Sequence, residues 1–285
     1  ELNSLLLEVM KADAAKVSAA DLLKAYQQNR FVSPSAIDHI TFLKMEIQLL
    51  ELAQIHGFEA IELSPLAPLG NCSALGLVDQ NKVVSALRGT EVVADATNLL
   101  ALEAASRRRA ASFNNHIVNV ATTHRHVRAQ ALPPVKGFTA HFKLFCAVTA
   151  GKDTGNLEFE KNALAQHIRL YLAFLQQIDI REVKVIIKVF GVDETALNSA
   201  HRIADFAIAQ FDTAIVSKQV VPVDEHRYYG GVRFSLNATI NQKEYNLGDG
   251  GVVDWSAKLT GNAKERMFTS GLGIELLIKL MHGLI

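Results

Sequence analysis

The sequence has 285 residues, 49% of them hydrophobic and 20% charged, and 29 basic residues balance 29 acidic ones. This composition excludes a disordered chain, and the balance of charge excludes the overall basic excess of a typical nucleic-acid-binding domain. No apolar run reaches the ~18 residues that a membrane-spanning helix needs, and no signal-peptide pattern is present. We therefore expect a cytoplasmic protein without a membrane anchor. Because the chain begins with Glu1, we also expect it to be processed or trimmed.

The chain has helical periodicity up to about residue 55. Ser18 and Asp21 form a capping-box pattern before an apolar pair. A longer helix is predicted to begin at 33–35 and to end at Gly57. It is followed by an alternating, extended segment at 58–63.

The rest of the chain mixes strand and helix patterns. The strand candidates are 83–87, 92–93, 139–148, 183–190, 232–239 and 244–247, the last two of which flank Asn241-Gln242 as a hairpin would. The helix candidates are 98–108, 159–178, 194–211 and 273–282. This pattern predicts an α+β fold with an antiparallel or mixed sheet and helices on one face. We divide the chain into a helical N-terminal appendage, 1–35, and a core domain, 36–285.

Six segments carry a resemblance to a known family. A predicted long helix leads into a segment at 57–65 that consists of a glycine, a strand and a proline. An acidic-x-threonine turn at 95–97 opens another helix. Later segments are an aromatic-bounded stretch at 145–159, a paired-tyrosine strand at 228–234, a double glycine at 249–254 and a glycine-rich turn at 270–277. In this order they resemble the motifs of class II aminoacyl-tRNA synthetases of the histidyl type. The regulatory subunit of ATP phosphoribosyltransferase belongs to the same branch.

The resemblance implies a core fold like that of class II synthetases and biotin ligases, with an antiparallel sheet, mixed at its edges, that is flanked by helices. It also implies that 145–159 is a strand–loop–strand motif. Four positions where the family has arginine carry other residues here: Cys146, Asp224, Val252 and Leu276. Because fixed arginines neutralise the charge that develops during adenylate formation, we expect no ordinary tRNA charging and no tRNA partner.

The same resemblance implies a ligand pocket. Asp95 matches the residue that receives an amino group, although capping of the following helix is an alternative role that is compatible with it. Thr97 belongs to the same turn. Tyr228, Tyr229, Gly250 and Gly251 would line the same cavity, the alternative for the glycines being hairpin and turn geometry.

Two further residues are candidates for replacing the lost charge, namely Lys152 and Arg233. The alternative for Arg233 is an arginine at the sheet rim. His124 and His126 would share one face of a strand, but no cysteine or carboxylate at ligand spacing joins them. We therefore predict no metal site. The cofactor is not assigned, and ATP with Mg²⁺ remains open.

These features predict a regulatory, ligand-binding protein that recognises a small amino acid-like or nucleotide ligand. The resemblance implies a homodimer formed through the first-motif helix and strand, and an enzyme is a further candidate partner. The sequence, which ends at Ile285, has no recognisable anticodon-binding segment. One alternative is an ATP-dependent ligase, or adenylating enzyme, that acts on a small molecule or a carrier protein. Another is an interaction module whose cavity is filled by side chains.

Overall fold

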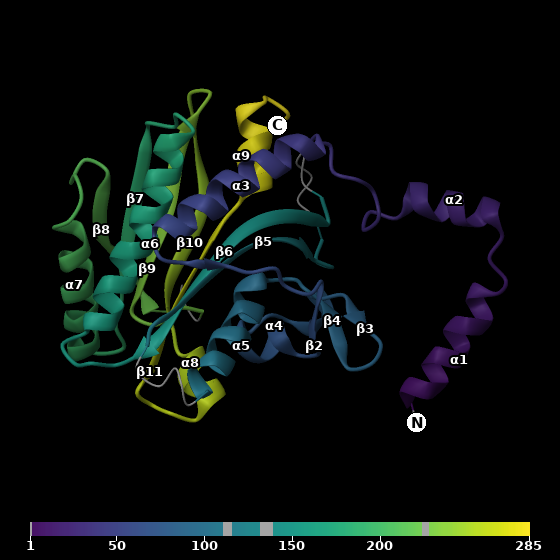
Figure 1. The fold of residues 1–285 in the computed structure, drawn as a ribbon, viewed down its shortest axis with the longest axis horizontal. Helices are drawn as coiled ribbons and strands as arrows, with labels where there is room; N and C mark the ends of the chain where they lie inside the picture. The colour runs from purple at the N-terminus through teal and green to yellow at the C-terminus, as the bar shows by residue number, and fades with distance from the viewer. Residues whose placement is uncertain (1, 111–115, 132–138, 224–227) are drawn as a thin grey trace.

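The computed structural model describes residues 2–110, 116–131, 139–223 and 228–285. The largest element among them is an eight-stranded sheet flanked by helices, so the chain is α+β, as predicted (Figure 1). The strands lie in the order β1 (Glu59–Ala60), β5 (Val118–Val127), β6 (His141–Lys152), β11 (Glu265–Leu272), β10 (Lys243–Val253), β9 (Val232–Ile240), β7 (Val183–Val189) and β8 (Val216–Val220). The outermost pairs, β1 with β5 and β7 with β8, are parallel, and the inner pairs are antiparallel. The prediction of an antiparallel sheet with mixed edges is confirmed.

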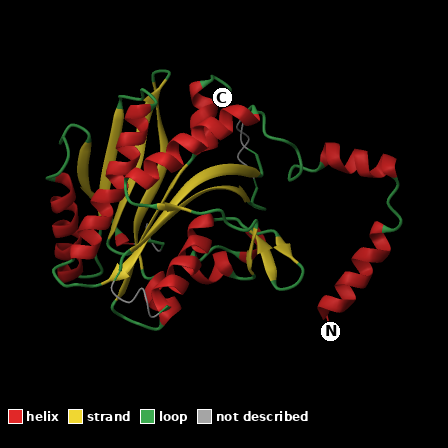
Figure 2. Ribbon diagram, in the orientation of Figure 1, coloured by secondary structure: helices red, strands yellow, loops and turns green. Residues whose placement is uncertain are grey.

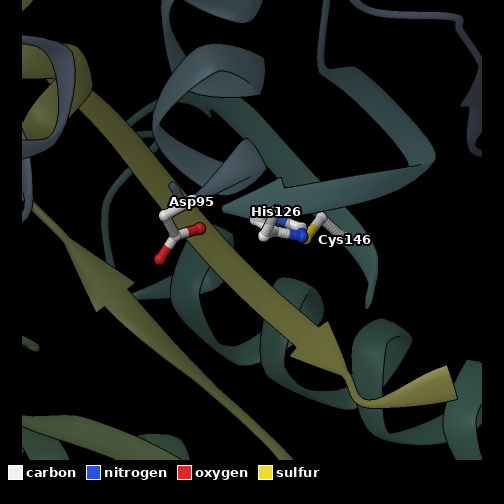
Figure 3. Close-up of side chains that lie close together, drawn as sticks. All are labelled: Asp95, His126 and Cys146. Atoms are coloured by element: carbon white, nitrogen blue, oxygen red, sulfur yellow. The ribbon is translucent and has the colours of Figure 1, made fainter. Parts of the chain in front are cut away.

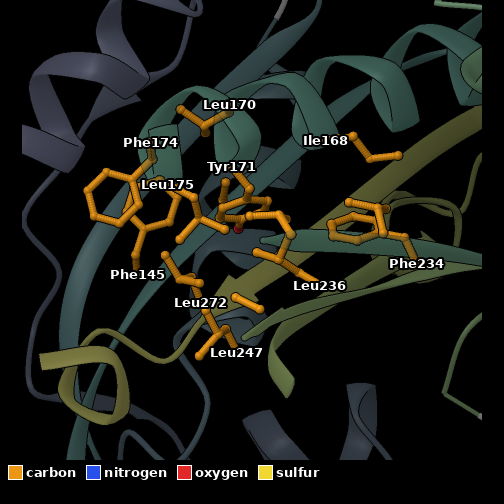
Figure 4. Packing of buried hydrophobic residues seen from close by; sticks show 14 of the residues in the cluster. Phe145, Ile168, Leu170, Tyr171, Phe174, Leu175, Phe234, Leu236, Leu247 and Leu272 are labelled. Atoms are coloured by element: carbon orange, nitrogen blue, oxygen red, sulfur yellow. The ribbon is translucent and has the colours of Figure 1, made fainter. Parts of the chain in front are cut away.

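One face of the sheet is covered by three helices, α3 (His39–Ile55), α6 (Glu158–Gln177) and α7 (Glu194–Ile208). Helix α6 carries apolar residues at helical spacing, such as Leu164, Ile168 and Tyr171, and all three are almost completely buried. They pack against residues that alternate along the strands, including Phe145 and Phe234 (Figure 4). We call this side the covered face.

The opposite face of the sheet is covered at one end only. Helices α5 (Ala96–Arg109) and α8 (Trp255–Thr260) pack there through a second core (Figure 2). A small sheet of β2 (Leu66–Pro68), β4 (Thr90–Val92) and β3 (Ser85–Ala86), with helix α4 (Asn71–Leu75) and a 3₁₀ turn (Gln80–Lys82), adjoins α5. Helix α9 (Ile274–Met281) follows β11. The part of this face that α5 and α8 leave open bears the candidate site, and we call it the open face.

The hairpin predicted around Asn241-Gln242 is confirmed. It joins β9 to β10, and both turn residues have positive φ, 52° and 67°, as a type I′ turn requires. The strand–loop–strand motif predicted at 145–159 is wrong, because β6 ends at Lys152 and helix α6 begins at Glu158. Strand β6 instead pairs antiparallel with β11 and with β5, which hydrophobicity alone did not reveal.

The predicted N-terminal helices are α1 (Leu2–Ala14) and α2 (Ala19–Gln28). Ser18 caps α2 as expected, since its Oγ accepts the N–H of Asp21 at 3.2 Å. Neither helix has a buried residue, and both extend away from the rest of the chain (Figure 1). The long helix α3 begins at His39, later than predicted, with Asp38 as its cap. Among the described residues, no helix combines the length and apolarity needed to cross a membrane.

Candidate functional site

A cavity of about 790 Å³ opens on the open face of the sheet, over β6, β9, β10 and β11 and beside the first turns of α5 and α9. This volume lies in the usual range for a small-molecule site. Five of the predicted site residues line it: Asp95, Thr97, Tyr228, Tyr229 and Arg233. Because the cavity is open, the structure argues against an interaction module whose cavity is filled by side chains.

Asp95 occupies the point where the chain enters helix α5. Its Oδ1 accepts hydrogen bonds from the Thr97 N–H at 3.0 Å and from Thr97 Oγ1 at 2.7 Å, so the carboxylate caps the helix. Thr97 Oγ1 also lies 3.3 Å from the Tyr228 hydroxyl. Capping and cavity lining therefore coexist at Asp95, and its carboxylate is held in a fixed orientation.

The paired tyrosines form an aromatic wall of the cavity. The Tyr228 and Tyr229 rings are 4.8 Å apart at 75°, and Tyr228 also meets Trp255 edge to face at 5.2 Å. Burial raises the pKa of both phenols well above the ordinary value, so both hydroxyls keep their protons. The Tyr229 hydroxyl donates a hydrogen bond to Oδ1 of Asp249 at 3.0 Å.

Asp249 and Arg128 are among the charged residues of the cavity that were not predicted from the sequence. Burial raises the pKa of the Asp249 carboxyl, whereas the Tyr229 hydrogen bond and the charge of Arg233 lower it. Arg128 donates from Nε to the Ala94 carbonyl at 3.1 Å, and its guanidinium lies 5.1 Å from the centre of the Phe142 ring. Alternation along β5 was the signal for Arg128, since it follows His124 and His126 with a period of two.

The charged groups of the cavity divide into paired and unpaired ones. Lys143 is paired with Glu46, and Lys279 with Glu275 at 2.9 Å. In contrast, no ion pair links Asp95, Asp249, Arg128 or Arg233 to one another or to any other residue of the described part of the chain. Nε of Arg233 is also buried without a hydrogen-bond partner there. Among the described residues, the cavity thus presents two carboxylates and two guanidinium groups that form no ion pair.

Comparison with known proteins identifies the fold. No protein-family model matches the sequence, and no curated protein does. A solved ATP phosphoribosyltransferase regulatory subunit/histidyl-tRNA synthetase from Bacillus halodurans superimposes with a TM-score of 0.70 at 16% identity, covering 89% of this chain and 83% of that one. A histidine–tRNA ligase subunit from Alicyclobacillus acidocaldarius gives 0.65 at 11% identity, with 90% and 97% covered. Histidyl-tRNA synthetase from S. aureus gives 0.62 at 14% identity, with 85% and 66% covered.

The chain has the fold of a class II aminoacyl-tRNA synthetase core. The sequence resemblance to the histidyl branch therefore predicted the fold correctly.

In this synthetase-like fold the two predicted glycines lie beneath the site and do not line the cavity. A Cβ on Gly251 would stand 2.6 Å from the Tyr229 ring, and one on Gly250 would stand 2.7 Å from the Phe234 ring on the covered face. Both contacts are too close for a real side chain. The glycines therefore allow the rings to lie against the backbone of β10, a packing role that supports the tyrosine wall.

Lys152 does not join the other predicted residues. It is exposed at the end of β6, opposite Glu265 of β11, and does not line the cavity. Cys146 of the same strand does line the cavity. Six residues of extended strand span about 20 Å, which explains why Lys152 falls outside it. Lys152 is therefore no longer a candidate ligand-binding residue.

The loss of the four arginines does not leave the cavity without cations, and Arg233, a predicted replacement, is among those that line it. Two of the four lost arginine positions, Cys146 and Leu276, do line it, Val252 does not, and Asp224 lies outside the described residues. However, four cations enter the cavity from other positions of the synthetase-like fold: Arg128, Lys143, Arg233 and Lys279. The cations of the cavity therefore stand at positions other than the four arginine positions of the family, and a comparison of motifs without gaps does not reveal them.

The structure also corrects the reason given against a metal site. Ligand atoms of Asp95, His126 and Cys146 lie within 4.8 Å of one another, so a cysteine and a carboxylate do join a histidine of β5 (Figure 3). His126 Nε2, however, accepts the N–H of Ala96 at 2.7 Å, and burial lowers the pKa of His126 to about 3. Burial has the opposite effect on the Cys146 thiol and raises its pKa. The Nε2 lone pair of the neutral imidazole thus accepts a hydrogen bond from the first turn of α5, and a metal ion would have to displace that bond.

Proposed function

We propose that this synthetase-like chain binds a free amino acid, or a small zwitterion of that kind, as a regulatory ligand and does not charge tRNA. The observation that carries the proposal is the set of two carboxylates and two guanidinium groups without ion pairs in one cavity. These four residues are half-buried, and in such surroundings opposite charges attract more strongly than they do in bulk water. A zwitterion supplies both signs in one molecule.

The ammonium group of the ligand fits the two carboxylates of the cavity. Asp95 is an acceptor with a fixed orientation, because Thr97 holds one of its carboxylate oxygens. Asp249 offers a second carboxylate, held by the Tyr229 hydroxyl. Hydrogen bonds between an ammonium and a carboxylate are about twice as strong as those between neutral groups. The two carboxylates would therefore dominate recognition of the amino end of the ligand.

The carboxylate group of the ligand fits the guanidinium groups of Arg128 and Arg233. Each presents a planar fork that matches a carboxylate. The cavity wall also includes aromatic and aliphatic residues, such as Phe142, Leu144 and Tyr228. An apolar or aromatic side chain of the ligand would pack there.

A regulatory role is supported by two observations. The Bacillus halodurans neighbour carries the words regulatory subunit in its name, at a similarity that shows the fold alone. In addition, Cys146 and Leu276 stand on the cavity at positions where the resemblance expects arginine. We propose that ligand binding here controls an enzyme partner.

The second candidate function is an ATP-dependent ligase, with Mg²⁺ as its cofactor. The observation in its favour is the presence of four cations in the cavity. Lys143 and Lys279 are already neutralised by Glu46 and Glu275, however, so two guanidinium groups of the described residues remain to face a triphosphate. A triphosphate carries more negative charge than two guanidinium groups balance, so we rank this function second.

We further propose a homodimer formed through α3 and β1. The outer side of α3 exposes Ile40, Leu43 and Ile47, at spacings of three and four residues. This spacing places the three side chains on one stripe of the helix. Such a stripe is typical of a helix that packs against a second copy.

The proposal is tested by a thermal-shift screen of the standard amino acids, with ATP and Mg²⁺ in a separate arm. A ligand present at 100 times its Kd stabilises the folded state by about 2.7 kcal/mol, so a true ligand raises the Tm by several degrees. We expect a response to one or a few amino acids, and amino acid-dependent pyrophosphate exchange far below that of a synthetase. Exchange at an ordinary synthetase rate would contradict the regulatory role, and a response to ATP alone would favour the ligase.

Matched variants then locate the ligand. Asp95→Asn removes the charge and keeps a good helix cap, so we expect the amino acid response to disappear while the ligand-free Tm changes little. Lys152→Ala, outside the cavity, keeps the full response. A response that survives in Asp95→Asn would place the ligand elsewhere.

A further inference from the structure

The N-terminal arm, which we define as α1 and α2 (residues 2–28), has no buried residue. Its large apolar side chains are exposed, with Leu2 at 70%, Leu5 at 62% and Leu22 at 63%. Isolated helices shorter than about 12–15 residues are marginal in water, and these have 13 and 10 residues. Packing against another surface would therefore stabilise the two helices of the arm.

The apolar residues of the arm form two stripes. In α1 they recur as Leu2, Leu5, Leu6 and Val9, and in α2 Leu22, Leu23 and Tyr26 follow the same spacing. Spacings of three and four residues place each set on one side of its helix. Each helix of the arm thus has an apolar side of the kind that packs against another helix.

The root of the arm is fixed to the core of its own chain. Arg30 donates one hydrogen bond to the Gln130 carbonyl at 3.0 Å and another to the Ala129 carbonyl at 2.7 Å, just beyond the end of β5. From this point the arm extends away from the sheet (Figure 2). The apolar stripe of its own α3, formed by Ile40, Leu43 and Ile47, is left uncovered.

The charge of the arm argues against a membrane or a nucleic acid as its target. Residues 2–28 contain three lysines and three acidic residues, so the basic face that both targets require is absent. An uncharged apolar stripe favours packing against another apolar stripe, and α3 carries such a stripe. The lengths also agree, since α1 spans about 20 Å and the 17 residues of α3 about 26 Å.

We infer that the N-terminal arm of each chain packs on the α3 stripe of a second copy, so that two copies exchange arms. This inference rests on the proposed dimer and is independent of the proposed ligand. It assigns the arm, which lies outside the resemblance to synthetases, to assembly. Because each arm is rooted on its own core, the exchange joins both chains through two equivalent contacts.

Cross-linking tests the exchange directly. The two natural cysteines, Cys72 and Cys146, are both buried, so an introduced thiol is selectively labelled. Full-length Leu22→Cys and Ile47→Cys chains with different affinity tags are mixed, allowed to exchange subunits and treated with a short bismaleimide. We expect a product that carries both tags. Val192→Cys, on an 83% exposed residue before α7, replaces Ile47→Cys in the control and yields no such product with Leu22→Cys.

A second measurement covers the case in which the labelled chains fail to associate. Leu22→Asp/Leu23→Asp places two charges on the apolar stripe of α2, and Ala20→Asp/Gln28→Asp places two on its polar side. We expect the first variant to weaken dimerisation at least about tenfold by light scattering and the second to leave it unchanged. Equal dimerisation of both variants, or cross-links formed only within one chain carrying both cysteines, would overturn the exchange. Ligand-induced thermal shifts that persist in the monomeric variant separate this outcome from a failure of the proposed function.

Discussion

The polar side chains on the two faces of the large sheet differ in whether other side chains pair with them. On the covered face, His167 bonds to Ser270 at 2.6 Å and to Thr149 at 2.9 Å, and Tyr171 bonds to the same serine at 2.7 Å. On the open face, Asp249 and Arg233 face the cavity without an ion pair among the described residues. These polar groups of the covered face are hydrogen-bonded within the protein, whereas these two charges that face the cavity lack an opposite charge in an ion pair within the described part of the chain. The covered face should therefore determine stability, and the open face binding.

The largest effect is expected from the covered face. Phe174→Ala removes a fully buried ring from the main core and should cost about 3–5 kcal/mol in the free energy of unfolding. Urea denaturation measures the loss. The matched change Val192→Ala, at an exposed position, should cost less than about 0.5 kcal/mol. A loss below about 1 kcal/mol for Phe174→Ala would contradict the assignment of this core.

A pH effect is expected from His167. Burial lowers its pKa from 6.5 to about 3, so the folded state keeps it neutral while the unfolded state takes up a proton below pH 6.5. The free energy of unfolding therefore falls as the pH drops from 6.5 towards 3, and His167 accounts for about 1.4 kcal/mol per pH unit of that slope.

The variant His167→Gln removes this titration and leaves the remaining groups to titrate as before. Denaturation of the wild type and the variant between pH 4 and 7 should show a shallower pH slope for His167→Gln, together with a lower stability at neutral pH. Identical slopes would mean that His167 titrates normally.

A smaller effect, on binding alone, is expected from the open face. Asp249→Asn should weaken the amino acid ligand about tenfold, because a carboxylate of the cavity becomes neutral. The variant still accepts the hydrogen bond of Tyr229, and it removes a carboxyl group that burial disfavours in its charged form. We therefore expect an unchanged or slightly higher Tm without ligand. A large loss of stability would show that the open face also serves the fold.

The smallest effect is expected for Lys152→Ala. This side chain is exposed at the end of β6, outside the cavity and opposite Glu265 in the neighbouring strand. Both the Tm and the ligand affinity should stay within experimental error of the wild type. A measurable loss of ligand affinity would restore the earlier assignment of Lys152 to the site.

Regular elements with strong local signals were predictable from the sequence. Helices α5 and α6 follow their apolar spacing, and the β9–β10 hairpin follows its two turn residues. Strand β5 was missed because its inward-facing residues include Thr122, His124 and His126, which are buried and polar. Long-range pairing buries them, and local hydrophobicity does not reveal it.

The candidate site was predictable only in part. The resemblance placed Asp95, Thr97, Tyr228 and Tyr229, and Arg233 was a candidate for replacing the lost charge. The structure brings these five together in one cavity. Arg128 and Asp249 were missed because the cavity gathers them from β10 and from the chain just beyond β5, far apart in the sequence. Lys152 was proposed only for its charge, and it lies outside the cavity because it follows Cys146 by six residues along β6.

The most direct test of the central claim is calorimetric titration of the responding amino acid and its methyl ester into the wild type and Asp95→Asn. The methyl ester keeps the ammonium group and lacks the carboxylate charge. If the unpaired charges bind a zwitterion, the ester binds the wild type at least about tenfold more weakly, and Asp95→Asn weakens both compounds. Equal affinity of the wild type for the amino acid and its ester would contradict the account.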